Sequence, residues 1–160
     1  MLYDKFDSGR EIGFDTKANK NFLTISPDGV LELLKKSEAI LDSAPSIDGW
    51  IFYSSKPTKK WKLLFDLLIN DDEVRFNANE WQYVLYKYPD NVYDVVIKVP
   101  ESYQSYEDYF YQIGDIALTV ELGEAFVINY INDIDLVFEF NEKEKGKEKE
   151  FSNLKLEILM

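Results

Sequence analysis

The stretch WQYVLYKYPDNVYDVVIKV, residues 81–99, carries the clearest structural pattern in this chain. Aromatic and β-branched side chains fill both of its halves, and these residue types favour β-strands. Between the halves, Pro89-Asp90-Asn91 predicts a tight turn, because proline fixes φ and because aspartate and asparagine accept turn conformations. We therefore expect two antiparallel strands, 81–88 and 92–99, which pair with each other.

The first of these strands has an aromatic residue on both faces, because successive side chains of a strand point to opposite sides of the sheet. Trp81 and Tyr83 share one face with Leu85, whereas Tyr86 and Tyr88 lie on the other. An aromatic inner face of the sheet is the simpler interpretation. A binding surface is the alternative, because tyrosine and tryptophan are favoured at interfaces.

Further strands are expected on either side of this pair. Asn70-Asp71-Asp72 predicts the turn of a hairpin between 65–69 and 73–76. The remaining strand signals lie at 2–6, 11–14, 21–26, 49–54, 126–131 and 134–140.

Two helices are expected between the strands. The first begins at Ser26-Pro27, where serine can cap the helix and proline suits its first position, and it ends at Pro45. Ser37 interrupts its apolar stripe, which consists of Val30, Leu33, Leu34, Ile40, Leu41 and Ala44. The second helix begins near Ser102 or Ser105 and ends at Gly123.

These elements predict an α+β fold, in which two helices pack on one face of a mainly antiparallel sheet. The expected order is strand, helix, strands, helix, strands. A chain of 160 residues fits one domain, with its core at about residues 20–140. Residues 141–150, which are rich in lysine and glutamate in equal numbers, are expected to be a mobile charged segment. Residues 151–160 are a possible edge strand.

The composition excludes several kinds of chemistry. The chain has neither histidine nor cysteine, so histidine-based triads, thiol catalysis and most zinc sites are ruled out. No phosphate-binding glycine loop is present. We therefore expect no catalytic residues, no metal and no cofactor.

The charge of the chain limits its partners. The formal net charge is −12, and a field of this sign repels nucleic acids and anionic membranes while it attracts basic proteins. Only Arg10 and Arg75 are arginine, the side chain best suited to binding phosphate. No apolar stretch approaches the roughly 20 residues of a membrane span, and no secretion signal is recognisable. The expectation is a cytoplasmic protein with a protein partner.

Carboxylates are the only abundant reactive groups. They cluster in three places, which are Asp71, Asp72 and Glu73, then Glu121 and Glu124, then Asp133 and Asp135. Aspartates in turns and acids at the end of a helix usually have structural reasons to be there. Asp71, Asp72, Glu121 and Glu124 nevertheless join Trp81, Tyr83, Tyr86 and Tyr88 as candidates for a binding surface.

Four short runs mark helix ends and strand starts, namely Ile25-Ser26-Pro27-Asp28-Gly29, Ala44-Pro45-Ser46-Ile47-Asp48-Gly49-Trp50, Asn79-Glu80-Trp81 and Leu122-Gly123-Glu124. Through these runs the chain resembles a family of uncharacterised bacterial α+β domains. In that family, a helix ending in Ala-Pro leads through Gly-Trp into a strand, and a late helix ends at Leu-Gly-Glu. The resemblance implies no activity, cofactor or site residue.

Three functions remain open. The leading hypothesis is a non-catalytic protein-binding module, for example an immunity or antitoxin-like protein whose acidic surface neutralises a basic toxin. The first alternative is a carboxylate-based hydrolase acting on carbohydrate, which requires two acids converging in a cleft and at least one raised pKa. The second alternative is a structural domain that forms oligomers.

Overall fold

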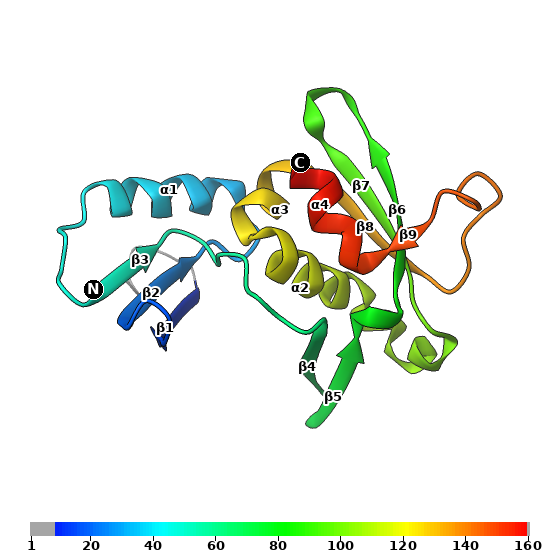
Figure 1. Cartoon of the computed structure of the whole chain (residues 1–160), viewed down its shortest axis with the longest axis horizontal. Helices are drawn as coiled ribbons and strands as arrows, with labels where there is room; N and C mark the ends of the chain where they lie inside the picture. The colour runs from blue at the N-terminus through cyan, green and yellow to red at the C-terminus, as the bar shows by residue number, and fades with distance from the viewer. Residues whose placement is uncertain (1–8, 160) are drawn as a thin grey trace.

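The computed structural model describes residues 9–159 and divides them into three groups of elements (Figure 1). A small three-stranded sheet with one helix comes first, a β-hairpin follows, and a four-stranded sheet with three helices completes the chain. Within this described part, no helix combines the length and the apolar character needed to cross a membrane.

The N-terminal unit contains strands β1 (Gly9–Asp15), β2 (Lys20–Ser26) and β3 (Trp50–Tyr53), with helix α1 (Leu31–Asp42) between the last two. β1 pairs antiparallel with β2, and β2 pairs parallel with β3. The parallel pair needs a crossover, and α1 supplies it. The strands expected at 11–14, 21–26 and 49–54 are thus confirmed, while the one at 2–6 lies outside the described residues.

Helix α1 begins later than the sequence suggests. A turn closed by the bond from Val30 N–H to the carbonyl of Pro27 (3.0 Å) precedes it, so Ser26 does not cap the helix. Of the predicted apolar stripe, only Leu34 is buried. Ser37, the residue that interrupts the stripe, is also buried. Its hydroxyl can be buried at little cost because it donates to the carbonyl oxygen of Ser54 at 2.6 Å.

The expected hairpin is present, with strands β4 (Leu64–Ile69) and β5 (Asp72–Asn77) in antiparallel register. Asn70 and Asp71 form its two-residue turn with φ values of 51° and 68°. Left-handed φ at both turn positions matches the strand twist, which explains why asparagine and aspartate occur there.

The four-stranded sheet has the order β8-β7-β6-β9. It consists of β6 (Gln82–Lys87), β7 (Tyr93–Lys98), β8 (Ile131–Val137) and the two-residue β9 (Lys149–Glu150). β6 and β7 are antiparallel as expected, whereas β7 and β8 are parallel. The fold is therefore rich in antiparallel pairs but contains two parallel ones.

The C-terminal helices lie on one face of this sheet. A 3-10 helix (Glu101–Tyr109) leads into α2 (Phe110–Leu122), and α3 (Glu124–Tyr130) and α4 (Leu154–Leu159) follow. Gly123 alone separates α2 from α3, with φ 88° and ψ 145°, a conformation that few other residues adopt.

Two expectations are wrong in this region. Residues 126–130 are helical and not extended, and only Ile131 of the expected strand 126–131 belongs to a strand, as the first residue of β8. A short apolar run cannot distinguish a buried helix from a strand. The edge strand expected at 151–160 is also absent within the described residues, because 154–159 form α4 with Leu154 in the core. β9 takes the edge position beside β6 instead.

Residues 141–150, the charged segment expected to be mobile, make defined contacts with the four-stranded sheet. Glu144 is 5% exposed, and its carboxylate accepts bonds from Tyr86 Oη at 2.9 Å and from the backbone N–H of Asn141 at 2.9 Å. The bond from Tyr86 joins the segment to β6, the bond from Asn141 closes a turn within the segment, and its last two residues extend the sheet as β9.

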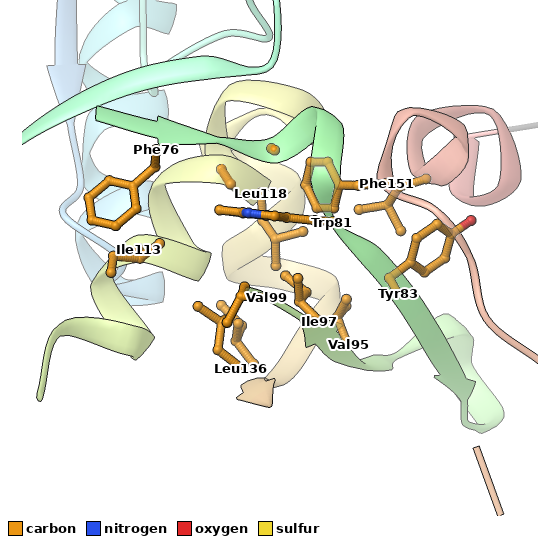
Figure 2. Packing of buried hydrophobic residues seen from close by; sticks show 14 of the residues in the cluster. Phe76, Trp81, Tyr83, Val95, Ile97, Val99, Ile113, Leu118, Leu136 and Phe151 are labelled. Atoms are coloured by element: carbon orange, nitrogen blue, oxygen red, sulfur yellow. The ribbon is translucent and has the colours of Figure 1, made fainter. Parts of the chain in front are cut away.

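The core lies between the four-stranded sheet, its helices and the hairpin (Figure 2). Trp81 is its centre, since its ring contacts Phe65, Tyr103 and Phe151 edge to face at centroid distances of 6.1, 6.2 and 5.5 Å. The α+β class and the antiparallel-rich sheets are confirmed. The elements are more divided than expected, because residues 9–159 contain three sheets and four α-helices, where one sheet and two helices were expected.

Candidate functional site

Two of the predicted surface aromatics belong to the core. Trp81 is fully buried and donates its indole N–H to Tyr103 Oη at 3.3 Å. Tyr83 is 1% exposed, and its hydroxyl donates to Glu157 of α4. Figure 2 shows both side chains directed toward the helices. A binding surface cannot include them, so the inner-face interpretation holds for this side of β6.

Glu121 and Glu124 are also buried, although helix-end acids are usually exposed. Glu121 accepts the indole N–H of Trp61 at 2.6 Å. Glu124 accepts from Ser26 Oγ at 2.8 Å through one oxygen and from the backbone N–H of Lys56 at 2.8 Å through the other. Both carboxylates therefore join distant segments and do not form a surface.

Asp71 and Asp72 lie at the tip of the β4–β5 hairpin. Figure 1 shows this tip and the β6–β7 turn on opposite sides of the molecule. The structure therefore does not bring these two aspartates together with Tyr86 and Tyr88. Their left-handed turn explains Asp71 without any functional role.

The outer face of the four-stranded sheet gathers acids and tyrosines instead. We call Tyr86, Tyr88, Asp94, Asp133 and Asp135 the acidic face. Asp94 of β7 is in register with Asp133 of β8, and Asp135 follows two positions along β8 on the same side. The neighbouring strand residues that point inward belong to the helix-covered core, so the acidic face points away from α2.

Hydrogen bonds hold part of this face in place. Tyr88 Oη donates to Asp94 Oδ2 at 2.7 Å, and Asn132 Nδ2 donates to Asp94 Oδ1 at 2.8 Å. Tyr86 is oriented by its bond to Glu144. Asp133 and Asp135 are exposed.

Burial, hydrogen bonding and nearby negative charge together shift the pKa values of groups on the acidic face. Burial, then the charges of Asp133 and Glu144, raise the pKa of Asp135 above its ordinary value. The hydrogen bond to Asp94, with burial and nearby negative charge, raises the pKa of Tyr88. Among residues 9–159, no lysine or arginine forms an ion pair with Asp94, Asp133 or Asp135. A cation from outside the chain would offset this negative charge.

A separate cleft of about 520 Å³ lies between the N-terminal unit and helices α2 and α3. Four carboxylates and two lysines line it, namely Glu11, Asp28, Asp115, Glu124, Lys56 and Lys59. Three of the acids have partners, since Glu11 pairs with Lys59, Asp28 accepts from Gly9 N–H, and Glu124 accepts the two bonds described above. Burial and then the charge of Glu124 raise the pKa of Asp115.

Neither site has the geometry of a metal centre. In the part of the chain that the structure describes, no three acidic side chains are grouped closely enough to hold an ion. The acidic face can present negative charge and phenol groups to a partner, and burial favours the protonated form of Asp115 more than that of a free carboxyl group.

Sequence reasoning missed two of these residues. Asp94 occupies the outward position of an otherwise apolar strand, which was a usable signal. Asp133 and Asp135 were recognised as a carboxylate cluster, and their two-residue spacing places them on one strand face. Asp115 lies within an apolar helix and has no local pattern that distinguishes it.

Comparisons with models of protein families, with curated proteins and with solved structures found no match to this chain. The resemblance to uncharacterised bacterial domains therefore stays a prediction, and function is argued from the geometry.

Proposed function

We propose that this protein is a non-catalytic module of the bacterial cytoplasm that binds a basic protein through the acidic face. The observation that carries this proposal is the register of Asp94 with Asp133, next to Asp135, on a sheet face that the helices leave uncovered. Tyr86 and Tyr88 add aromatic area beside the charges. Carboxylates and tyrosines together complement the lysines and arginines of a partner.

Electrostatics support a basic partner more than a neutral one. The formal net charge of −12 accelerates the encounter with a cationic protein, and this effect weakens as salt screens it. At the contact itself, a lysine or arginine placed near Asp135 would offset the charges of Asp133 and Glu144, which add to burial in raising the pKa of Asp135. A toxin neutralised by an immunity or antitoxin-like protein is one partner with this chemistry.

A defined cationic probe tests whether the acidic face is the binding surface. Titration of the labelled chain with an oligolysine peptide should shift the backbone NMR signals of β7 and β8 first. The triple variant Asp94→Asn, Asp133→Asn, Asp135→Asn should weaken binding by about tenfold or more, because each charge pair contributes on the order of 0.5–1 kcal/mol.

A matched control variant distinguishes an effect of the acidic face from an effect of the net charge. The variant Glu38→Gln, Asp42→Asn, Asp48→Asn removes three exposed carboxylates from and after α1, so it changes the net charge equally. If both triple variants weaken binding to the same extent, the acidic face is not a specific site. A separate titration uses a basic protein that is encoded by a neighbouring gene. If that protein does not bind the chain, the result argues against the proposed partner.

A carboxylate-based hydrolase acting on carbohydrate is the second candidate, and one observation favours it. Asp115 has a raised pKa inside a cleft of about 520 Å³, next to the buried Glu124, as a general acid would. Against this role, both oxygens of Glu124 already accept hydrogen bonds, which leaves no free second carboxylate beside Asp115.

Turnover of chromogenic glycosides by the purified chain decides this candidate. Activity that disappears in Asp115→Asn, with an unchanged circular dichroism spectrum, would establish the hydrolase. No turnover above the Asp115→Asn background would eliminate it.

A further inference from the structure

A second hollow of about 540 Å³ lies on the N-terminal sheet, beside the cleft that contains Asp115. Strands β1, β2 and β3 supply its floor, and the segment 57–60 forms one wall. Its lining shares only Glu11 and Lys59 with the cleft. We call this hollow the sheet groove.

Aromatic rings form much of the floor of the sheet groove. Phe22 and Tyr53, on the paired strands β2 and β3, have ring centroids 6.4 Å apart at an interplanar angle of 64°. The ring of Phe22 lies over Gly13 of β1, where a side chain would meet it at 2.5 Å. Glycine at this position therefore keeps the ring in the floor. Phe14 adds a further apolar side chain at the edge.

Hydroxyl groups without partners line the same groove. Four side chains carry them, Thr16, Thr24, Tyr53 and Thr58, and none of the four hydroxyls hydrogen-bonds to another group within residues 9–159. Thr24 is the notable one, because it is 1% exposed and its Oγ1 is the single buried side-chain oxygen or nitrogen in the described part that lacks a partner. Because buried polar atoms are nearly always paired, a polar group from outside the chain would stabilise Thr24 Oγ1 by a hydrogen bond.

The charge of the sheet groove contrasts with that of the rest of the chain. Lys17, Lys59 and Lys60 line it together with Glu11 and Asp15. Glu11 pairs with Lys59 at 3.2 Å, and Asp15 accepts the backbone N–H of Lys17 at 2.8 Å. Neither Lys60 nor the ammonium group of Lys17 has an ion pair among the described residues. With three lysines against two acids, the groove has an excess of one positive charge on a chain of net charge −12.

We propose that the sheet groove binds a sugar ring that carries a carboxylate, that is, a hexuronate unit. The apolar face of the ring would lie on Phe22 and Tyr53, its hydroxyls would pair with Thr24 Oγ1 and Tyr53 Oη, and its carboxylate would face Lys60. A flat aromatic acid would leave the hydroxyls unpaired, and a neutral sugar would leave Lys60 uncompensated. This binding requires neither the acidic face nor any chemistry at Asp115.

Glucuronate is the probe, with glucose and benzoate as comparators that lack the carboxylate or the hydroxyls. Glucuronate should shift the NMR signals of Phe22, Thr24 and Tyr53 saturably, and it should bind about tenfold more tightly than either comparator, as one added hydrogen bond or ion contact provides. Benzoate or glucose binding as tightly as glucuronate would overturn the assignment, as would shifts that map elsewhere.

Three variants test the assigned roles. Thr24→Val keeps the side-chain shape, so the chain should fold, and it should weaken glucuronate binding about tenfold; Tyr53→Phe provides the same test at a partly exposed position. Lys60→Gln should weaken glucuronate but leave glucose unchanged, whereas the control Lys35→Gln on α1 should change neither. Equal binding by Thr24→Val, Tyr53→Phe and the unchanged chain would refute the proposal.

Discussion

Replacing Glu124 should loosen the attachment of the N-terminal unit to the helices. Its side chain is 5% exposed and is bound by Ser26 from the end of β2 and by Lys56 from the segment after β3. The carboxylate of Glu124 therefore connects the N-terminal unit to the C-terminal helices through two hydrogen bonds. We expect Glu124→Ala to destabilise the chain strongly.

The magnitude follows from the two bonds. A hydrogen bond to a charged group contributes about 1.5–3 kcal/mol, and a buried donor left without a partner costs a similar amount. The Lys56 N–H has no other acceptor at this site, so its full contribution is lost. The Ser26 hydroxyl can turn to Asp28 Oδ1 at 3.0 Å, which reduces its share. The expected loss in the free energy of unfolding is therefore about 3 kcal/mol for Glu124→Ala. For Glu124→Gln it is about 1–2 kcal/mol, because the amide oxygen can still accept one bond.

Urea unfolding at neutral pH measures these losses, with Glu38→Ala on the exposed side of α1 as a control that should change stability by less than about 0.5 kcal/mol. Hydrogen exchange should show that the Lys56 amide and the strands β1–β3 lose protection before β6 and β7 do. The reasoning would be refuted if Glu124→Ala lowered the free energy of unfolding by less than about 1 kcal/mol. It would also be refuted if β1–β3 lost no more hydrogen-exchange protection than β6 and β7.

Three further outcomes are expected. Gly114→Ala should destabilise the chain by about 1–2 kcal/mol in urea unfolding, because a methyl group there would lie 2.6 Å from the branched side chain of Ile134 and the overpacking exceeds the gain in helix propensity. Asp115→Asn should raise the urea midpoint at pH 7, since burial disfavours the ionised carboxylate and raises its pKa; the advantage should disappear as the pH falls toward 3.8. Burial and the hydrogen bond to Glu157 raise the pKa of Tyr83 above its ordinary value of 10.0, so the neutral phenol contributes stability that is fully present below pH 10.0 and is lost as the pH rises through the raised value. Tyr83→Phe should reduce that alkaline slope in a series of melting temperatures, since Tyr88 and other tyrosines with raised pKa values contribute the rest, and an unchanged slope would contradict the assignment.

Local patterns identified most of the strands correctly. The pair at 81–99 and the hairpin at 65–76 could be predicted, because alternation, β-branched residues and turn-forming residues act over a few positions. The second helix and its end at Gly123 follow from the same kind of signal. Short apolar runs carried no such information, so 126–131 was assigned to a strand although 126–130 are helical.

The candidate site was only partly predictable. The two faces of β6 could be assigned from the alternation of Trp81, Tyr83 and Tyr86, but which face the helices cover depends on contacts far along the chain. The register of Asp94 with Asp133 joins residues that no local pattern connects, because parallel pairing follows a long crossover.

The amino-acid sequence by itself determined which chemical groups this protein can use. It has abundant carboxylates and phenols and a large negative charge, and it has neither imidazole nor thiol groups. Tertiary structure alone decided which of those acids support the fold and which face outward. It buried Glu121 and Glu124 between distant segments and left Asp133 and Asp135 exposed. The physical reason is that the burial of a charge and its partners arise from contacts between segments far apart in the chain, and neighbouring residues do not encode these contacts.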